Sequence, residues 1–535
     1  MLSYRKLAMR VLGRPLHTGD SGSPRPASQR AAAFILTAAM LTTLAAPAFA
    51  DIWHIENGDI TISAGESGNN VTQNNNTTYG DTNTIITNQN KDTASSHTVT
   101  IEAKDKDDKV EVTLKDVNID TSSRNKAAVS VTGEGDTNIK LDGDNALKSD
   151  IYRSGIYGSG SGSLTISGGE NDSLTAQGGS GANGISSSGS LTISGGTVTA
   201  NGDDGGRGIS SSGSVTISGG STVTANGGSG TISGGDGICS SGGVTISGGS
   251  TVTANGGNGG SLVGGDGIRS DGGVTISGGT VKAAGGDSKD GYGGDGIRSG
   301  GGVTISGNTV NAAGGNGGKV GGYGICSFDR VAISGGTVEA AGGNGSTGGG
   351  SGIYSSVIDL SGSLELTAKA GSPNGKALSQ KGSELVLDTI KDKLGPGAKV
   401  TATDADGKVI DQVSTPRPVE PEESSSSSDG GSAAPSAPAS PLPGLTVTDK
   451  DGQRISYTST QSGNTLTVCV GRLTASFRIS LAALRQLRAE GIETIAFQTV
   501  LCSTTLSVDE LLAMGGENAE AVLTHRFTDS SLTVG

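Results

Sequence analysis

Aromatic side chains are scarce in this chain, where Phe, Tyr and Trp together account for 3% of 535 residues. They are too few to fill an ordinary globular core, whereas small residues suit the narrow interior of a solenoid. Histidine is also rare, and the four copies are scattered along the chain, at His17, His54, His97 and His525. Acidic residues in the middle of the chain do not form pairs placed for acid–base chemistry. We therefore predict no catalytic residues.

Positive charge is in short supply as well, and the formal net charge is −14. Residues 1–50 hold six of the 38 Lys and Arg but only one of the 52 Asp and Glu, which leaves 32 basic against 51 acidic residues. A nucleic-acid backbone or an anionic membrane surface would repel such a chain. The sequence therefore predicts no nucleic-acid partner, and its acidity is compatible with calcium or with solubility alone.

Only one long apolar run is present, close to the start. A basic segment precedes the uncharged stretch 31–46, and Ala48-Phe49-Ala50 follows it as an A-x-A cleavage pattern. This order predicts a secretory signal peptide over residues 1–50, cut before Asp51. The alternative is an uncleaved membrane anchor, for which the run is marginal in length. With the signal removed, we expect a secreted, extracellular protein that does not insert into a membrane.

Glycine is abundant, with 94 residues, and it recurs in phase. A Gly-Ile pair opens each of eight copies of one pattern at intervals of 24 to 30 residues, starting at Gly155, Gly184, Gly208, Gly237, Gly267, Gly296, Gly324 and Gly352. A period in this range predicts a solenoid. The alternative is a disordered Gly/Ser tract, but such tracts do not keep Ile and Val in phase over eight copies.

Each copy contains three short strand-like pieces separated by glycine-rich turns, such as Gly184–Ser187, Leu191–Gly196 and Thr197–Ala200. Alternation directs their Ile, Leu, Val and Ala side chains inward and their Ser and Thr side chains outward. Stacked copies then build one apolar column, in which Ile246 and Ile276 are expected to be buried one coil apart. Three strands per turn without a helix predict a mainly β fold, a parallel β-helix whose coils are stable when stacked.

The pattern also predicts the domain organisation. Residues 51–150 are less regular but strand-rich, and we interpret them as N-terminal strands and a cap that covers the open end of the β-helix. The β-helix repeats are predicted over residues 151–412, ending in a strand at Glu384–Asp388 and a hairpin built from Lys399–Thr403 and Lys408–Ile410.

Residues 413–444 are rich in Pro and Ser, which predicts an extended linker. Residues 445–535 have the mixed pattern of a small α+β domain without an active-site motif. Ser480 is predicted to cap one helix and Ser507 a second helix in this domain.

The four cysteines fall into two pairs of different character. Cys239 and Cys326 occupy the same outward position after Gly-Ile, three coils and roughly 14 Å apart, which is too far for a disulfide. We expect them to be incidental outward residues. Cys469 and Cys502 share the C-terminal domain and could pair, which the sequence alone does not decide.

Four segments together resemble a known family: Asp107–Asp120, Ala127–Val131, Leu141–Lys148 and Gly162–Gly169. They are similar to secreted β-helix proteins of anaerobic Gram-positive bacteria that carry carbohydrate-binding domains, and the resemblance extends over about residues 100–370. It implies a right-handed β-helix at the bacterial cell surface, a partner polysaccharide of the acidic or plant cell-wall type, and calcium bound along the coils. It assigns no individual binding residue.

Three aspartates precede the Gly-Ile pair in successive coils, at Asp236, Asp266 and Asp295. Carboxylates stacked about 5 Å apart repel each other unless a cation lies between them, and oxygen ligands suit calcium. The sequence therefore proposes these three residues as a metal site for calcium. The alternative is that they are ordinary solvated turn residues.

The second strand presents outward hydroxyls in six coils: Thr165, Ser167, Thr192, Ser194, Thr216, Ser218, Thr245, Ser247, Thr275, Ser277, Thr304 and Ser306. We call this set the hydroxyl face. It is a candidate carbohydrate-binding face, it also resembles the flat faces of ice-binding solenoids, and the alternative is that Thr simply fits an exposed strand.

Three functions follow from these patterns. The first is a non-catalytic surface protein that binds polysaccharide through the β-helix, with calcium assisting. The second is a structural or adhesive spacer. The third is a polysaccharide lyase or hydrolase, which rests on the fold alone.

Overall fold

The computed structural model describes part of the chain: residues 51–416, 445–449, 453–455, 457–462, 464–470, 474–499, 503–514, 519–526 and 529–534. The chain divides into two compact units, Met1–Pro421 and Glu422–Gly535. The expected signal peptide and nearly all of the expected linker lie outside the described residues.

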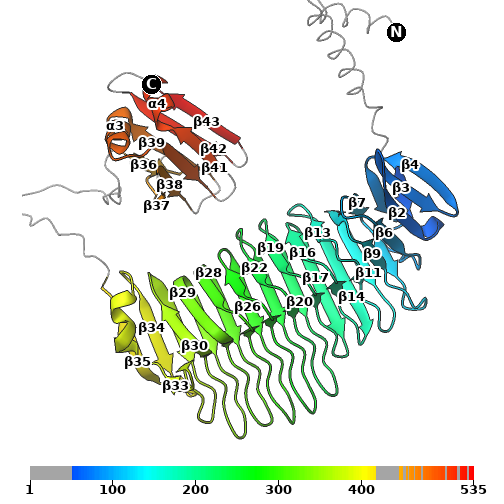
Figure 1. Cartoon of the computed structure of the whole chain (residues 1–535), viewed down its shortest axis with the longest axis horizontal. Helices are drawn as coiled ribbons and strands as arrows, with labels where there is room; N and C mark the ends of the chain where they lie inside the picture. The colour runs from blue at the N-terminus through cyan, green and yellow to red at the C-terminus, as the bar shows by residue number, and fades with distance from the viewer. Residues whose placement is uncertain are drawn as a thin grey trace, which may run out of the picture. The chain divides into compact units, whose positions relative to one another are not determined.

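The first unit is a parallel β-solenoid of about 13 turns (Figure 1). One coil is built from β15 (Ile185–Ser187), β16 (Leu191–Ser194) and β17 (Thr197–Asp203), which are the three pieces expected from the sequence. Each strand pairs in parallel with its counterpart in the next coil, as Ile185 does with Ile209 and Leu191 with Val215. The mainly β, parallel β-helix prediction is therefore confirmed.

The strands form three rows along the solenoid. The first row contains β2 (Ile60–Gly65), β6 (Val99–Ala103), β9 (Val129–Gly133), β12 (Ile156–Gly158), β15, β18 (Ile209–Ser211), β21 (Ile238–Ser240), β24 (Ile268–Ser270), β27 (Ile297–Ser299), the start of β29 (Ile325–Ala341), β30 (Ile353–Leu360) and β32 (Leu378–Gln380). The second contains β1 (Ile52–His54), β5 (Thr84–Thr87), β7 (Lys109–Lys115), β10 (Asp136–Asp142), β13 (Leu164–Ser167), β16, β19 (Val215–Ser218), β22 (Val244–Ile246), β25 (Val274–Ile276), the start of β28 (Val303–Ala313), the middle of β29 and the end of β30. The third contains β8 (Asn118–Asp120), β11 (Asp144–Lys148), β14 (Ser173–Ser180), β17, β20 (Thr222–Asn226), β23 (Thr251–Asn255), β26 (Thr280–Ala284), the ends of β28 and β29, β31 (Leu364–Lys369) and β34 (Lys399–Thr403).

The core is a continuous apolar column inside the three rows. Ile246 pairs with Ile276 in the next coil, and both side chains are fully buried. The neighbouring Thr245 pairs with Thr275 on the outer side, where both are at least partly exposed. This confirms the predicted inside–outside assignment, in which every second side chain of a strand contributes to the core.

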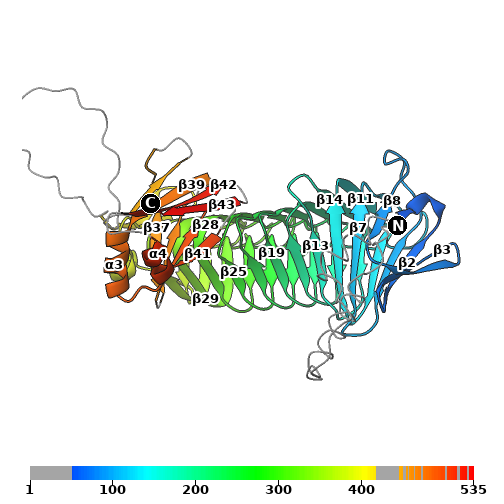
Figure 2. The same ribbon diagram turned by 90° about the horizontal axis from the view of Figure 1, so that it is seen from above.

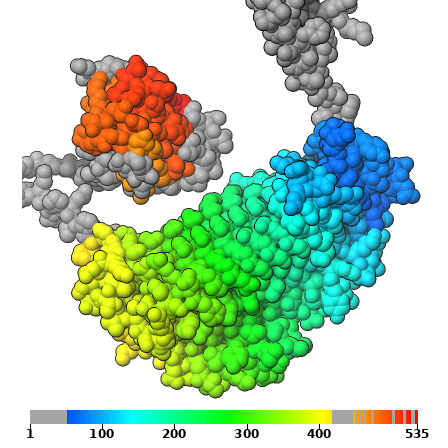
Figure 3. Space-filling model, viewed as in Figure 1, coloured from blue at the N-terminus to red at the C-terminus, as the bar shows by residue number. Residues whose placement is uncertain are grey.

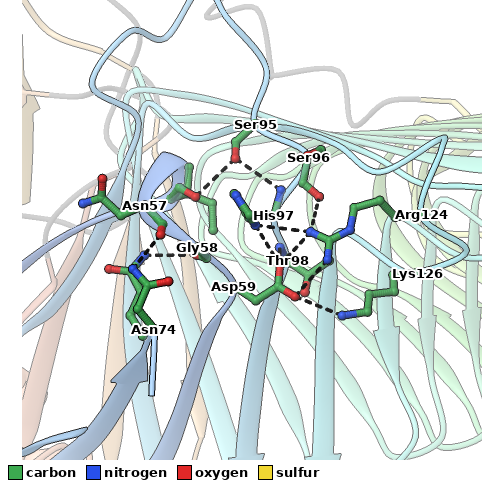
Figure 4. A network of polar contacts seen from close by, with 12 residues as sticks. Asn57, Gly58, Asp59, Asn74, Ser95, Ser96, His97, Thr98, Arg124 and Lys126 are labelled. Atoms are coloured by element: carbon green, nitrogen blue, oxygen red, sulfur yellow. Dashed lines mark hydrogen bonds and ion pairs between the residues drawn. The ribbon is translucent and has the colours of Figure 1, made fainter. Parts of the chain in front are cut away.

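The N-terminal end of the solenoid is closed by antiparallel strands. β2 continues into β3 (Gly68–Gln73) and β4 (Asn76–Asp81), which pair antiparallel with each other, after the short 3-10 helix η1 (Ile55–Asn57). The Asp59 carboxylate contacts three residues at this end. Its oxygens lie 2.9 Å from Arg124 Nη1, 3.0 Å from Lys126 Nζ and 3.2 Å from His97 Nδ1 (Figure 4). Antiparallel strands and this ion-pair network therefore lie at the N-terminal end of the solenoid.

The C-terminal end differs in one element from the prediction. Instead of a strand over 384–388, the short strand β33 (Ser383–Glu384) ends at Glu384, and the 3-10 helix η2 (Leu387–Lys393) follows. Leu387 and Ile390 on η2 are buried over the end of the core, so a helical turn covers the last coil. The predicted hairpin is present as β34 and β35 (Val409–Ser414), which pair antiparallel.

Five arms project from the middle coils where the sequence predicted glycine-rich turns. They are the segments between the third strand of one coil and the first strand of the next, at 227–236, 256–266, 285–295, 314–323 and 342–351. Figure 1 shows them stacked along one side of the solenoid, Figure 2 gives the view from above, and in Figure 3 this side is a continuous surface.

Backbone hydrogen bonds hold the arms together. The N–H of Gly257 donates to Gly235 O of the preceding arm, and the N–H of Gly265 donates to Gly257 O of the same arm, both at 2.8 Å. A Cβ atom on Gly257 would lie 2.1 Å from Gly228 O, so a larger residue would separate the arms. The glycines are therefore what allows the arms to pack backbone against backbone.

The second unit contains two four-stranded sheets among its described residues, in the orders β36-β39-β42-β43 and β37-β38-β40-β41. The strands are β36 (Leu445–Thr448), β37 (Thr458–Ser462), β38 (Thr465–Cys469), β39 (Thr474–Ser480), β40 (Thr494–Gln498), β41 (Ser503–Ser507), β42 (Glu520–Arg526) and β43 (Asp529–Val534). The unit also contains helices α3 (Leu481–Ala489) and α4 (Val508–Met514), and Ser480 Oγ caps α3 by accepting the N–H of Ala483 at 3.2 Å.

Candidate functional site: a groove between the coils and the arms

A groove of about 730 Å³ runs between the first row of strands and the returning limbs of the arms. One wall is formed by residues before and after the Gly-Ile pairs of successive coils, and the other by the arms. The lining side chains that can bind a ligand are Asn183, Arg207, Asp236, Asp266, Arg269, Tyr292, Asp295, Arg298 and Tyr323. The groove therefore brings guanidinium, carboxylate and phenol groups together in an open channel parallel to the coil stack.

The three predicted aspartates line this groove, but they are not solvated turn residues. Asp236, Asp266 and Asp295 are 7%, 6% and 4% exposed. Asp236 Oδ1 accepts the N–H of Asp266 at 2.9 Å, and Asp266 Oδ1 accepts the N–H of Asp295 at 2.7 Å. The third carboxylate repeats the contact with the N–H of Tyr323 at 2.7 Å. Each of these carboxylates thus accepts a hydrogen bond from the backbone of the next coil.

Arginine supplies positive charge beside two of the stacked carboxylates. Asp236 Oδ2 lies 3.1 Å from Arg207 Nε, and Asp295 Oδ2 lies 3.1 Å from Arg298 Nη1. Asp266 makes no ion pair with any described residue. Burial, followed by the charges of Asp295 and Asp236, raises the pKa of Asp266 well above its ordinary value. Burial also raises the pKa of Asp295, although the N–H of Tyr323 and the Arg298 charge oppose this shift.

These contacts leave few carboxylate oxygens of the three aspartates free for a cation. One oxygen of each carboxylate already accepts a backbone N–H, and two of the three second oxygens contact arginine. Among the described residues, no group of three or more His, Cys, Asp or Glu is arranged to hold a metal ion. Calcium needs six to eight oxygen ligands, so the ladder alone would supply too few free ones. Calcium binding at Asp236, Asp266 and Asp295 stays a prediction of the sequence.

Arg269 differs from the other two arginines of the groove. It pairs in register with Cys239 on one side and with Arg298 on the other. Arg298 is held by Asp295 and also lies over the ring of Phe328, with Cζ 5.3 Å from the ring centre. Arg269 is exposed and makes no ion pair within the described part of the chain. Among the three arginines that line the groove, Arg269 is therefore the one without an ion-pair partner among the described residues.

Aromatic rings lie at two places along the groove. Tyr292 is on the arm wall, bridged to Val263 and Val320 of the neighbouring arms, and is 55% exposed. Tyr323 is on the coil wall and stacks on Tyr354 of the next coil, with ring centres 5.0 Å apart. An exposed ring facing polar groups across a channel gives a ligand an apolar surface to stack on.

The hydroxyl face lies outside this groove. Its strands keep their register from coil to coil, as Thr165 with Thr192 and Ser194 with Ser218. Exposure increases along the row, because Thr275, Ser277 and Thr304 are exposed whereas the hydroxyls of the first coils are half-buried. The face is thus a regular outward ladder, and its binding of carbohydrate stays a prediction.

One expectation about the cysteines is wrong. Cys326 takes an outward position after Gly-Ile, yet it is buried, and burial raises the pKa of its thiol. Cys239, in the same position, is half-buried, and burial raises its pKa to about 11. The arms lie beside this row of strands, so a short outward side chain such as that of Cys326 can be covered, whereas the longer side chain of Arg269 is exposed. Cys469 is a free thiol 3.4 Å from Gln498 Oε1, and Cys502 lies outside the described residues.

The sequence-based interpretation missed the arginines and Tyr292. The sequence did contain a signal for two of the arginines, because Arg269 and Arg298 repeat at the same position after Gly-Ile. No signal was available for Tyr292, because nothing in a glycine-rich segment shows which wall its single aromatic residue faces.

No protein-family model, curated protein or solved structure matches the chain. Within the described residues, no helix combines the length and the apolar character needed to cross a membrane.

Proposed function

We propose that the protein is a non-catalytic secreted or cell-surface protein that binds polysaccharide in the groove between its coils and arms. One observation carries this proposal: Arg269, which has no ion-pair partner among the described residues, and exposed Tyr292 line the same open channel. A sugar ring presents hydroxyls to hydrogen-bonding groups and an apolar face to an aromatic ring, and binding sites generally combine apolar surface with a few placed polar groups.

The contacts that the three aspartate carboxylates of the groove already make favour a binding function over a catalytic one. Glycoside hydrolysis needs one carboxyl group to donate a proton and a second to act as base or nucleophile beside the bond. Asp236 and Asp295 are ion-paired and Asp266 accepts a backbone N–H, so all three have structural roles. A lyase or hydrolase activity would therefore need other residues, and no step of the proposal uses calcium.

The test is a glycan array probed with the mature chain, with and without calcium. We expect wild-type protein to bind a subset of polysaccharides, and Tyr292→Ala to weaken that binding by about tenfold through loss of stacking. Thr275→Ala and Thr304→Ala are the matched controls, because they alter the hydroxyl face and leave the groove intact. If the hydroxyl variants lose binding and Tyr292→Ala keeps it, the site is the hydroxyl face and the groove proposal is wrong.

A structural spacer is the second candidate, and the observation that favours it is the continuous register of the solenoid. Like residues pair from coil to coil through the repeats and both ends are capped. A protein that binds no glycan under any of the array conditions, with or without calcium, would support the spacer.

A further inference from the structure

Nine Asn-Gly pairs lie in the solenoid unit, and this dipeptide can modify itself. The glycine nitrogen can attack the asparagine side chain, because glycine has no Cβ atom to hinder the approach. A bond forms between the glycine N and Cγ, the bond from Cγ to Nδ2 breaks, and Nδ2 leaves with the displaced proton as ammonia. Water then opens the cyclic imide to aspartate or isoaspartate. The pairs begin at Asn57, Asn183, Asn201, Asn226, Asn255, Asn258, Asn316, Asn344 and Asn374.

Four of these pairs are held at both reacting groups by the next coil. Asn258 Oδ1 accepts the N–H of Asp287 at 2.9 Å, and the N–H of Gly259 donates to the backbone O of the same aspartate at 2.8 Å. Attack would therefore require the two coils to separate at this point. The same two contacts recur in three further pairs: Asn183-Gly184 with Arg207, Asn316-Gly317 with Asn344, and Asn344-Gly345 with Ser372.

Three more pairs form a ladder of side-chain amides at the ends of third-row strands. Asn226 Nδ2 donates to Asn201 Oδ1, and Asn255 Nδ2 donates to Asn226 Oδ1, both at 2.8 Å. The N–H groups of Gly227 and Gly256 donate to backbone oxygens of the next coil at 2.8 and 2.7 Å. Asn201 itself belongs to β17, which pairs with a strand on each side. The ladder thus fixes the amides that would have to move for attack.

The pair at Asn57 lies at the N-terminal end and has neither kind of contact with another coil. Its side chain is exposed and makes no hydrogen bond with a described residue, whereas its backbone O accepts from Asn74. Figure 4 shows Asn57 and Gly58 directly before Asp59. The N–H of Gly58 donates to Ile55 O within its own turn at 3.4 Å, which is a long hydrogen bond. Both reacting groups are therefore held only weakly.

The pair at Asn374 lies near the C-terminal end of the solenoid. Asn374 is exposed, and its side chain makes no hydrogen bond within the described part of the chain. The N–H of Gly375 donates to Gly371 O at 3.0 Å, inside the same loop. Asn374 therefore lacks the contacts between coils that hold Asn344 two residues away from it at Ser372.

We propose that Asn57 and Asn374 are self-modification sites of the folded protein, where deamidation gives aspartate or isoaspartate, and that stacking of the coils protects the other seven pairs. The inference does not depend on the groove or on the proposed function. An isoaspartate at Asn57 would lengthen the backbone between η1 and Asp59, the residue that contacts Arg124 and Lys126. We therefore expect ageing of the protein to begin at the ends of the solenoid.

The test incubates the mature chain at mildly alkaline pH, with one sample folded and a second in urea. Peptide mapping by mass spectrometry measures deamidation at each pair, and an isoaspartyl methyltransferase labels the isoaspartate. In the folded sample we expect Asn57 and Asn374 to react at least about tenfold faster than the inner pairs, because the inner pairs react only after local opening. In urea, all nine pairs should react at similar rates.

A double variant measures how much of the reaction the two sites carry. Asn57→Gln with Asn374→Gln replaces two exposed side chains, and a glutamine would have to form a larger ring. We expect this variant to release only a minor part of the ammonia that the folded wild type releases over the same interval. Asn90→Gln is the control, since Asn90 is exposed but is followed by Lys91, and it should release as much ammonia as wild type.

Three results would overturn the inference. If an inner pair such as Asn258-Gly259 deamidates in the folded protein as fast as Asn57 and Asn374, the contacts between coils do not protect it. If the double variant releases as much ammonia as wild type, the end pairs are not the reacting sites. If the inner pairs stay slow in urea, their neighbours in the sequence protect them and the fold does not.

Discussion

The Asp266 carboxyl group lies between two other carboxylates in a buried row, and this controls its response to pH. Burial and the charges of Asp295 and Asp236 raise its pKa well above the ordinary value. The folded protein therefore keeps this proton at pH values where the unfolded chain has lost it. As pH rises from the ordinary carboxyl pKa of about 3.9 toward the folded value, this group lowers stability.

Asp266→Asn should remove this loss of stability with rising pH. The amide oxygen can still accept the N–H of Asp295, but no charge forms beside Asp236 and Asp295. We expect wild type and variant to melt at similar temperatures near pH 4, and the variant to melt at a higher temperature as pH rises. Thermal scans from pH 4 to 8 measure this, with the exposed Asp271→Asn as control. A variant that loses stability with pH as steeply as wild type would contradict the role of Asp266.

Asp59 at the N-terminal end shows the opposite shift. Burial would raise its pKa, but hydrogen bonds from Lys126, the N–H of Thr98 and Arg124 outweigh burial and hold the pKa well below its usual range (Figure 4). A lowered pKa stabilises the fold above the ordinary carboxyl pKa, and this stabilisation is lost as pH falls toward the folded value.

We therefore expect Asp59→Asn to destabilise the solenoid unit by about 1–2 kcal/mol at pH 7 and by less at pH 3. The group is partly exposed, so solvent screening keeps the cost below that of a fully buried pair. Urea unfolding at the two pH values measures the difference, and the exposed Asp92→Asn serves as control. An equal loss at both pH values would show that the network acts through packing and not through charge.

At the scale of the element, the arms depend on the absence of side chains. A Cβ atom on Gly343 would lie 1.9 Å from Gly315 O, whereas on Gly348 of the same arm the nearest atoms are Val320 methyls at 3.9 Å. We expect Gly343→Ala to cost about 1–3 kcal/mol as overpacking, and Gly348→Ala to change stability by less than about 0.5 kcal/mol. Hydrogen exchange of the arm amides compares the two. Equal protection in both variants would mean that the arms are not packed backbone to backbone.

Strand rows give a second contrast between neighbouring residues. Ile246 is fully buried in the core column and Thr245 faces out. Ile246→Asp should destabilise by about 3–5 kcal/mol because the charge has no buried partner, and Thr245→Asp should stay within about 0.5 kcal/mol of wild type. Chemical unfolding followed by circular dichroism measures both. Similar losses from the two substitutions would contradict the alternation of inward and outward side chains.

The strands could be predicted from the sequence because side-chain alternation reports directly which face is buried. Ile246, Thr245 and their equivalents carry that signal in every coil. The arms could not be predicted as ordered elements, since glycine has no side chain to show a pattern and their bonds join backbone groups. The groove could not be predicted either, because the arms form one of its walls. Asp266 was singled out from its repeat position, but its burial depends on neighbours in other coils. Cys326 was misassigned for the same reason.

At the scale of the whole solenoid unit, stability is expected to come from contacts between neighbouring coils. In the repeats, each strand pairs with its counterparts directly before and after it, so strand pairing joins a coil to its two neighbours. For such an array, stability approximates a sum over coils and interfaces. Loss of one complete coil should then remove one coil and one interface and leave the remaining register intact.

The chain offers a deletion that tests this directly. Removing residues 237–266 joins Asp236 to Gly267, so the Gly-Ile of the next coil replaces the lost one, and β18 meets β24 as it met β21. We expect this variant to keep a β-type circular dichroism spectrum and a single cooperative transition with a modestly lower midpoint. Removing residues 237–251 instead would place half a coil against complete neighbours and shift inward residues out of the column, so it should abolish cooperative unfolding. If the complete-coil deletion is as disruptive as the half-coil deletion, stability is not a sum of neighbour terms. The complete-coil deletion also changes the groove, because it removes Asp266 and brings Arg269 beside Arg207 and Asp236. If the fold survives, the glycan binding proposed for the groove should weaken because the channel is shorter by one coil.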